Sequence, residues 1–210
     1  MKPFKVRECF NLVSRGKSPQ YVEQSDVKVV NQACIYWEGL NLNKVKYQDE
    51  SKNYDKGLIC SGDVLVNSTG TGTLGRAAVV PHVAETEKLI ADSHVTILRP
   101  NTDIINPYYF TYYLQDSRNQ ERLYSQCVNG STNQIELSKE KLSELMITLP
   151  KIDEQGIIVD KLRKIDEVRN KRQKQLEKLD ELVKARFVEM FGDILSDNKL
   201  PLVQLKELQT

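Results

Sequence analysis

Residues 152–191 read IDEQGIIVDKLRKIDEVRNKRQKQLEKLDELVKARFVEMF and carry a helical repeat that no other part of the chain sustains. Apolar positions recur along this stretch in alternating steps of four and three residues, which is the heptad pattern of a coiled coil. No proline interrupts the stretch, Asp153 is its predicted N-cap, and Gly192 follows Phe191, where a helix-ending glycine is expected. The sequence therefore predicts one long helix of roughly 60 Å, at about 1.5 Å per residue.

The heptad repeat defines a seam, which is the row of side chains expected to face a partner helix. Arg169 and Arg172 occupy seam positions in its middle, and Arg186 occupies another near its end. These arginines are consistent with an exposed section of coiled coil, with a polar layer that fixes register and partner, or with a site for phosphates or an acidic surface. Because the helix is longer than a small domain is wide, we expect it to pack on a partner. The apolar seam residues are Ile158, Leu162, Ile165, Leu176, Leu179, Val183 and Met190.

The 210 residues leave room for one domain of good size and an extension. A hydrophobic content of 40%, with five Phe, nine Tyr and one Trp, supports a packed core. No run approaches the roughly 20 apolar residues that cross a membrane, and the first residues lack the apolar stretch of a signal peptide. We therefore expect a soluble, cytoplasmic protein with no membrane partner.

The net charge of +1 conceals an uneven distribution of charge. Residues 1–150 contain 17 basic and 17 acidic side chains, whereas residues 161–178 contain eight basic and three acidic ones. A nucleic-acid role of the front region would therefore depend on the local placement of charge, because its overall field is weak.

The four cysteines are scattered without a CxxC pair, at Cys9, Cys34, Cys60 and Cys127. With only two histidines in the chain, this pattern favours buried or partly buried free thiols over a zinc site or a disulfide framework. No nucleophile constellation is recognisable around His82 or His94, so structural or surface roles are expected for both.

Residues 1–150 contain short apolar runs broken by polar loops, which predicts a mixed α/β domain that is mostly β in its middle. Residues 3–13 favour a short edge strand or a turn of helix, and the polar stretch 41–55 favours a surface excursion. The expected strands are residues 27–30, 33–37, 62–67, 76–80, 94–98 and 146–149.

Two helices are expected in the second half of this domain. Asn106 followed by Pro107 resembles an N-cap and first helical residue, which predicts a helix to about Tyr124. Ser138 can cap a short helix through Leu145.

A loop rich in glycine and threonine lies between two predicted strands and fits the pattern G-x-G-x-x-G at Gly70–Gly75. A dinucleotide fold needs a helix after the third glycine. Only five residues lie between Gly75 and Pro81, however, and they are rich in Ala and Val. A kinase-type glycine loop lies between strands, yet no Val-Ala-Ile-Lys, His-Arg-Asp or Asp-Phe-Gly follows. The remaining alternatives are a tight hairpin and a polar loop that contacts a phosphate or a base edge, and we favour the second. The candidate contacts are Asn67, Ser68, Thr69, Thr71, Thr73 and Arg76.

A second polar loop runs from Val128 to Gln134. Its side chains are of the kinds that pair with adenine edges or phosphates, although Asn, Gly and Ser are also ordinary residues of solvated loops. The candidate contacts in this loop are Ser131, Thr132, Asn133 and Gln134.

The tail of the chain contains a possible internal repeat. Pro201–Leu208 resembles Pro3–Cys9 with one residue inserted, and a match this short also arises by chance.

Together these motifs resemble the target recognition domain of specificity subunits of type I restriction-modification systems. The resemblance covers nearly the whole chain, and its most specific motif is the junction Leu149-Pro-Lys-Ile-Asp-Glu-Gln155. The other matching segments are Gly62-Asp-Val-Leu-Val66, the Thr/Gly loop, Gly75-Arg-Ala-Ala-Val-Val80, Asn106-Pro-Tyr-Tyr-Phe110, Asn129-Gly-Ser-Thr-Asn-Gln134 and Ala185-Arg-Phe-Val-Glu-Met-Phe-Gly192.

The resemblance implies a recognition domain at residues 1–150, a spacer and dimerisation helix at 151–192, and a tail at 193–210 that resembles the start of a second recognition domain. Family members usually carry two such domains and two antiparallel helices that space the halves of a bipartite DNA site. This sequence therefore looks like a half subunit, which we expect to form a homodimer through the long helix and to read a palindromic bipartite target.

The resemblance also implies that the chain has no catalytic centre and no cofactor of its own. Methyl transfer from S-adenosylmethionine would belong to the modification subunits, and ATP-driven translocation and cleavage to the restriction subunit. The implied partners are double-stranded DNA and both kinds of subunit. The alternative is a coiled-coil interaction protein whose front domain binds another protein or a small ligand rather than DNA.

Overall fold

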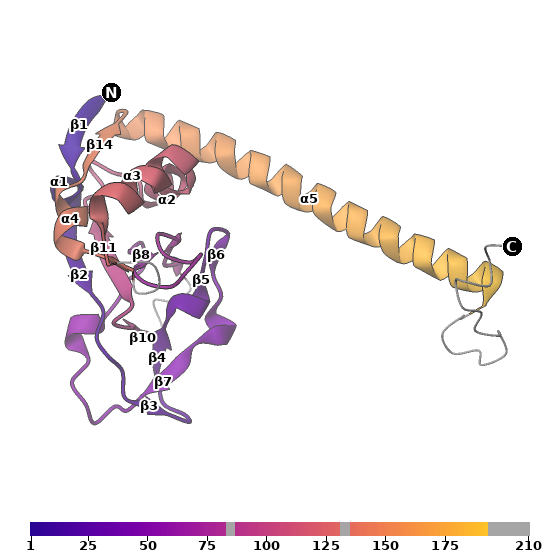
Figure 1. The fold of residues 1–210 in the computed structure, drawn as a ribbon, viewed down its shortest axis with the longest axis horizontal. Coiled ribbons are helices and arrows are strands. Elements are labelled where there is room, and N and C mark those ends of the chain that lie inside the picture. Colours follow the sequence, from indigo (N-terminus) through magenta and orange to yellow (C-terminus); the bar gives the residue numbers. More distant parts are fainter. Residues whose placement is uncertain (83–86, 131–134, 193–210) are drawn as a thin grey trace, which may run out of the picture. The chain divides into compact units, whose positions relative to one another are not determined.

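The computed structural model describes residues 1–82, 87–130 and 135–192. The chain divides into two compact units, Met1–Asp160 and Lys161–Thr210. Within the described residues, all of the strands belong to the first unit, and the second unit consists of the continuing long helix α5 (Figure 1).

The centre of the first unit is an antiparallel sheet with the strand order β2-β11-β8-β9. Successive side chains of β8 point to opposite faces, so that Val64 and Val66 join one core cluster and Leu65 joins the other. Because both faces are buried there, β8 and β9 read as nearly continuous apolar runs rather than as alternating ones. The four strands are β2 (Phe10–Arg15), β11 (Val95–Pro100), β8 (Val64–Asn67) and β9 (Ala77–Val79).

A second four-stranded sheet has the order β10-β4-β7-β3, in which only the β10–β4 pair is parallel. Its strands are β10 (Lys88–Ala91), β4 (Val27–Val30), β7 (Lys46–Gln48) and β3 (Tyr21–Val22). Three two-stranded pairs complete the unit: β1 (Lys2–Lys5) with β14 (Met146–Leu149), β5 (Ile35–Tyr36) with β6 (Gly39–Leu40), and β12 (Val128–Asn129) with β13 (Glu136–Leu137). Short 3-10 helices are η1 (Gln32–Cys34), η2 (Leu42–Lys44) and η3 (Asp55–Gly57).

The mixed α/β prediction is confirmed, and most expected strands lie within two residues of the observed ones. The prediction of a surface excursion at 41–55 was wrong for β7, because the Gln48 side chain is buried and bonds the Gln20 N–H and the Asp49 carbonyl. Strand β10 was not predicted, and the expected strand 33–37 begins as η1 and becomes β5 only at Ile35.

Four short helices gather beside the β1–β14 pair (Figure 1): α1 (Val6–Cys9), α2 (Pro107–Gln115), α3 (Ser117–Cys127) and α4 (Lys139–Glu144). Asn106 caps α2 as predicted, since its side chain accepts hydrogen bonds from the Tyr108 and Tyr109 N–H groups. The single helix expected to Tyr124 is two helices, because Asp116 adopts an extended conformation and caps α3 by accepting from the Asn119 N–H. Ser138 caps α4 as predicted, by accepting from the Lys141 N–H.

All four cysteines are free, as predicted. Cys9, Cys34 and Cys127 are buried as predicted, but the prediction was wrong for Cys60, which is exposed. Burial raises the pKa of the Cys9 and Cys127 thiols to about 11, which keeps them protonated and inert as core residues.

Helix α5 spans Ile152–Phe191, as the heptad pattern predicts. Its N-cap is two residues earlier than the predicted Asp153, because Ile152 is already helical and the Glu154 side chain accepts from the Lys151 N–H. Gly192 has a positive φ of 78° and its N–H bonds the Val188 carbonyl, which ends the helix in the left-handed conformation that glycine favours.

The first unit extends to Asp160, ten residues beyond the predicted domain end at 150, because the first turns of α5 pack on the domain. Gln155 and Val159 are the two buried residues of the helix. The assignment of separate functions to the three predicted segments stays a prediction.

Candidate nucleic-acid interface

The loop between β8 and β9 holds a tight, hydrogen-bonded shape. The Thr73 and Leu74 N–H groups both donate to the Gly70 carbonyl, and the Gly75 N–H donates to the Asn67 carbonyl. Gly70 has a φ of 96°, and a Cβ there would lie 2.4 Å from the Thr73 hydroxyl oxygen. Glycine is therefore required at position 70 both for its backbone conformation and for space.

The first two candidate contacts lie in the interior of this loop. Asn67 and Ser68 are fully buried. The Ser68 hydroxyl pairs with that of Thr96 at 2.7 Å, and the Asn67 amide donates to the Gln32 carbonyl at 3.3 Å. These contacts hold the loop in place, so any direct DNA contact rests on the other predicted positions.

The outward part of the loop carries the remaining candidates. Thr71 is exposed, and Thr69, Thr73 and Arg76 are partly exposed. The Thr69 hydroxyl accepts from the Gln32 side chain at 2.8 Å, and that of Thr73 donates to the Thr69 carbonyl at 3.1 Å. Thr71 and Arg76 have no side-chain hydrogen bond or ion pair within the described ranges, so their polar groups remain available to a ligand.

Two side chains of helix α3 bond to the main chain of this loop. The Tyr124 hydroxyl donates to the Leu74 carbonyl at 3.1 Å, and the Gln120 amide donates to the Gly75 carbonyl at 3.3 Å. Burial raises the pKa of Tyr124, and the positive charge of nearby Arg76 partly offsets that rise. The neutral tyrosine thus keeps its donor proton at physiological pH.

The second predicted loop lies beside the first. Thr69 and Glu136 form an isolated antiparallel bridge, and the Leu137 N–H donates to the Ser68 carbonyl at 2.8 Å. The β12–β13 pair is therefore fixed to the β8–β9 loop through main-chain bonds. The candidates Ser131, Thr132, Asn133 and Gln134 lie between these two strands but outside the described residues.

A basic group stands at the base of the β12–β13 pair. Arg15 donates to the Glu136 carboxylate at 2.8 Å and to the Leu137 carbonyl at 2.5 Å. Burial lowers the pKa of Arg15, and the charge of Glu136 opposes that effect. Arg15 thus fixes the hairpin to β2.

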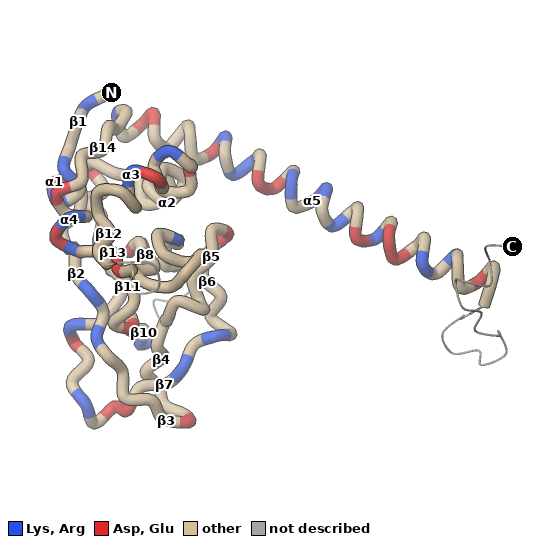
Figure 2. Tube along the Cα trace, in the orientation of Figure 1, with Lys and Arg blue, Asp and Glu red and all other residues tan. Residues whose placement is uncertain are grey.

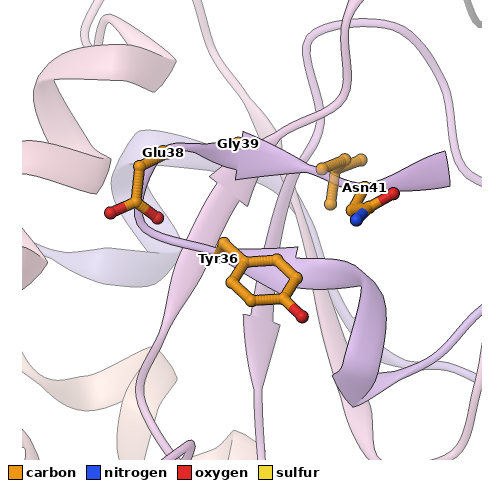
Figure 3. Close-up of a pocket in the computed structure, with 5 residues that line it drawn as sticks. Tyr36, Glu38, Gly39 and Asn41 are labelled. Atoms are coloured by element: carbon orange, nitrogen blue, oxygen red, sulfur yellow. The ribbon is translucent and has the colours of Figure 1, made fainter. Parts of the chain in front are cut away.

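The structure also indicates contributors that the sequence did not. Gln32, Gln120 and Tyr124 position the loop from other elements, and no local pattern marks them because their partners lie far away in sequence. On the β5–β6 hairpin, Tyr36 lines an open pocket of about 260 Å³ together with Glu38 and Asn41 (Figure 3).

The Ser61 hydroxyl and the Nδ1 of His82 are hydrogen-bonded at 2.9 Å, and the glycine motif lacks the helix that a dinucleotide site needs. The segment after Gly75 is strand β9, as expected, so no helix N-terminus faces the loop as a dinucleotide would require. Within the described ranges, no group of three or more His, Cys, Asp or Glu side chains could hold a metal ion. No helix in the same ranges is long and apolar enough to cross a membrane.

Residues 1–179 match the family of the type I restriction modification DNA specificity domain. The chain belongs to this family. It is 26% identical over 163 residues to a protein of Methanocaldococcus jannaschii named as the MjaX type I restriction enzyme specificity subunit, a match that covers 76% of this chain and 38% of that protein.

Solved structures of type I systems share the fold. The HsdS subunit from Thermoanaerobacter tengcongensis superposes with a TM-score of 0.59 at 18% identity, over 96% of this chain and 51% of that one. The S subunit from M. genitalium gives a TM-score of 0.54 at 16% identity, over 90% and 44% of the two chains. A chain from a structural study of type I R-M complex assembly gives 0.65 at 20% identity, over 88% and 43%. This chain thus spans about half the length, or less, of the relatives it matches.

Proposed function

We propose that this specificity-family chain reads one half of a bipartite DNA target, through the β8–β9 loop and the adjoining β12–β13 hairpin. The observation that carries the proposal is the main-chain coupling of these two polar loops between Thr69 and Glu136. Two segments more than sixty residues apart in sequence are thereby held as one surface.

The chemistry of this surface suits a DNA groove. Hydroxyl groups such as that of Thr71 donate and accept hydrogen bonds at base edges and phosphates, and Arg76 can pair with guanine or with a phosphate. Residues 1–150 carry equal numbers of basic and acidic side chains, and the two kinds are interspersed along this part of the chain (Figure 2). The attraction to DNA must therefore come from local groups such as these. A rigid backbone lowers the entropy lost when these groups engage DNA.

The remaining part of the proposal is the assembly. Two copies would pair through α5 and present two identical reading surfaces to a palindromic bipartite target. Modification subunits would supply S-adenosylmethionine-dependent methyl transfer, and a restriction subunit would supply ATP-driven cleavage. The chain itself would contribute sequence reading and a scaffold, without a catalytic centre or cofactor and without a membrane partner, in the cytoplasm.

The test is binding and methylation by the assembled complex. The chain is combined with its modification subunits, the target is identified by sequencing the methylated bases of an expressing host, and binding is measured by mobility shift at rising salt. Arg76→Ala is expected to weaken binding of the target about tenfold or more, since a good arginine contact contributes about 1–3 kcal/mol. The matched control is Lys52→Ala, which removes the same charge from an exposed residue of the loop after β7.

The two outcomes separate the alternatives. If Arg76→Ala and Lys52→Ala bind and methylate the target equally well, Arg76 is not part of the reading surface. If the complex binds no DNA at low salt, the front domain is better explained as a binding site for a protein or a small ligand.

A further inference from the structure

The seam of α5 is symmetric about a point between Asn170 and Lys171. Beyond the first turns, its apolar side chains are exposed, with Leu176 57% and Leu179 55% accessible. Between Ile158 and Val183, every seam residue has a counterpart of the same kind at the same distance on the other side of the point, whereas Arg186 and Met190 have Gln155 and Lys151 as counterparts. The counterparts are Ile158 and Val183, Leu162 and Leu179, Ile165 and Leu176, and Arg169 and Arg172.

This symmetry specifies an antiparallel pair. When two copies of α5 run in opposite directions about that point, the apolar residues of the span 158–183 face one another, and the arginines of the two copies share the central layer. A slide of one heptad would place Arg169 opposite Leu179 or Ile165 of the partner copy. Such a slide buries a guanidinium against an aliphatic side chain, which is costly without a partner. The arginines therefore favour the symmetric alignment of the two helices over one shifted by a heptad.

An apolar cluster lies at the C-terminal end of α5, and no other described residue covers it. Phe187, Met190 and Phe191 are 49%, 61% and 62% exposed, and the rings of Phe187 and Phe191 are 4.9 Å apart. Three large apolar side chains on the last turn of a helix favour burial against a partner. Gly192 ends the helix directly after them.

A groove of about 600 Å³ lies at the opposite end of the same helix, within the first unit. Its apolar lining comes from β1, from the loop before α2, from the end of β14 with the residue after it, and from the start of α5. The charged groups at its rim include Lys2 and Asp103. The apolar lining residues are Phe4, Ile104, Leu149, Pro150 and Ile152.

The antiparallel register, which follows from the seam alone, places the end of one helix opposite the groove of the second copy. In the antiparallel register, Phe187 falls opposite Glu154 of the second copy, Met190 opposite Lys151 and Phe191 opposite Pro150. Glu154, Lys151 and Pro150 all line the groove. Because the pair has two-fold symmetry, each copy would use its groove and its helix end once, so both contacts form twice.

We propose that the aromatic end of α5 inserts into the β1–α5 groove of a second copy of this chain, in the antiparallel register set by Arg169 and Arg172. This inference rests on the homodimer proposed above and specifies its geometry. The dimer is thereby joined at both ends of the helix pair as well as along the seam.

The register is tested by cross-linking of the full chain. Two preparations, each with one exposed cysteine, are made in a Cys60→Ser background, because Cys60 is the exposed native thiol and Cys9, Cys34 and Cys127 are buried. One carries Lys151→Cys and the other Met190→Cys, and each is treated with a short bis-maleimide alone and after mixing. The expected result is a covalent dimer in the mixture and none from either variant alone.

Other products would overturn the inference. A covalent dimer from Met190→Cys alone indicates parallel helices, and one from Met190→Cys mixed with Ile158→Cys, without the expected product, indicates a seven-residue slide. Either result leaves the homodimer itself standing. A wild-type chain that is monomeric in light scattering overturns both this inference and the homodimer.

The groove is tested by its effect on the dimer dissociation constant. Phe187→Ser with Phe191→Ser is expected to raise this constant about tenfold or more, and Ile104→Lys in the groove to do the same. Val188→Ser is the matched control, since Val188 is 47% exposed but does not belong to the cluster of Phe187, Met190 and Phe191, and it should change the constant less than about twofold.

Combining the groove and helix-end variants separates direct contact from general weakening. If the two sites touch, the combined variant should bind scarcely more weakly than either alone. Fully additive effects, with the circular dichroism melting curve of each variant unchanged, would contradict insertion of the helix end into the groove.

Discussion

The Gln155 side chain accepts a hydrogen bond from the Asn106 N–H at 2.9 Å, which joins the first turns of α5 to the start of α2. Its amide group donates to the Ile104 carbonyl at 2.9 Å and to the Pro150 carbonyl at 3.0 Å. Gln155 is fully buried, and these three bonds satisfy both ends of its side chain. The Leu-Pro-x-x-x-Glu-Gln junction therefore fixes the origin of the long helix on the domain.

Gln155→Ala should destabilise the first unit by about 3 kcal/mol, because the substitution leaves a buried N–H and two carbonyls without a partner. The measurement is urea denaturation followed by tryptophan fluorescence. Gln173→Ala, at an exposed position of the same helix, should change stability by less than about 0.5 kcal/mol. Equal stability of the two variants would show that the junction bonds are dispensable.

Gly70→Ala should distort the β8–β9 loop and weaken target binding, whereas Gly72→Ala should have a smaller effect. Both glycines have positive φ, at 96° and 76°, so both substitutions strain the backbone. Only a Cβ at position 70 meets neighbours, at 2.4 Å from Thr73 and 2.7 Å from Gln32, while nothing lies within 4 Å at position 72. Mobility shift of the assembled complex measures the difference, and equal loss in both variants would assign it to backbone strain alone.

Glu144→Gln should make the fold less sensitive to acid. The hydrogen bond from Lys5 and the charge of Arg7 lower the pKa of Glu144 below its ordinary value of 4.5. The carboxylate therefore contributes stability that is present above 4.5 and is lost as the pH falls through the lowered value. The wild type should lose more stability than the variant when urea midpoints at about pH 7 and about pH 4 are compared. Glu121→Gln, at an exposed position of α3, should behave as the wild type.

Leu176→Asp combined with Leu179→Asp should convert the proposed dimer to a monomer in light scattering, because four carboxylates would enter the apolar part of the seam. Lys174→Asp combined with Lys178→Asp is the control: it changes the net charge more but lies off the seam. A dimer that survives the leucine substitutions would place the interface elsewhere.

The sequence predicted the elements whose signals are local. The bounds of α5 followed from its repeat and its flanking glycine, and the β8–loop–β9 unit followed from buried strands around a glycine-rich turn. The break between α2 and α3 was missed because Asp116 is an unremarkable helix residue until its cap bond to Asn119 is seen.

The site was predicted only in outline, for a similar reason. The residues predicted between Asn67 and Arg76 do lie in and beside one loop, but the inward placement of Asn67 and Ser68 depends on Thr96 and Gln32, which lie on other elements. Contacts such as Gln120 with Gly75 span 45 positions and leave no periodic trace in the sequence. Which residues touch DNA stays a prediction.

The way in which the β8–β9 loop is built has a consequence for how such a protein can change over generations. Its shape depends on glycines, main-chain bonds and the inward side chains of Asn67 and Ser68, while Thr71 and Arg76 contribute none of the side-chain bonds that hold it. Substitutions at those two outward positions therefore carry little folding penalty. If the loop reads DNA as proposed, a lineage can accumulate such substitutions, and so acquire a new target preference, without first passing through an unstable intermediate.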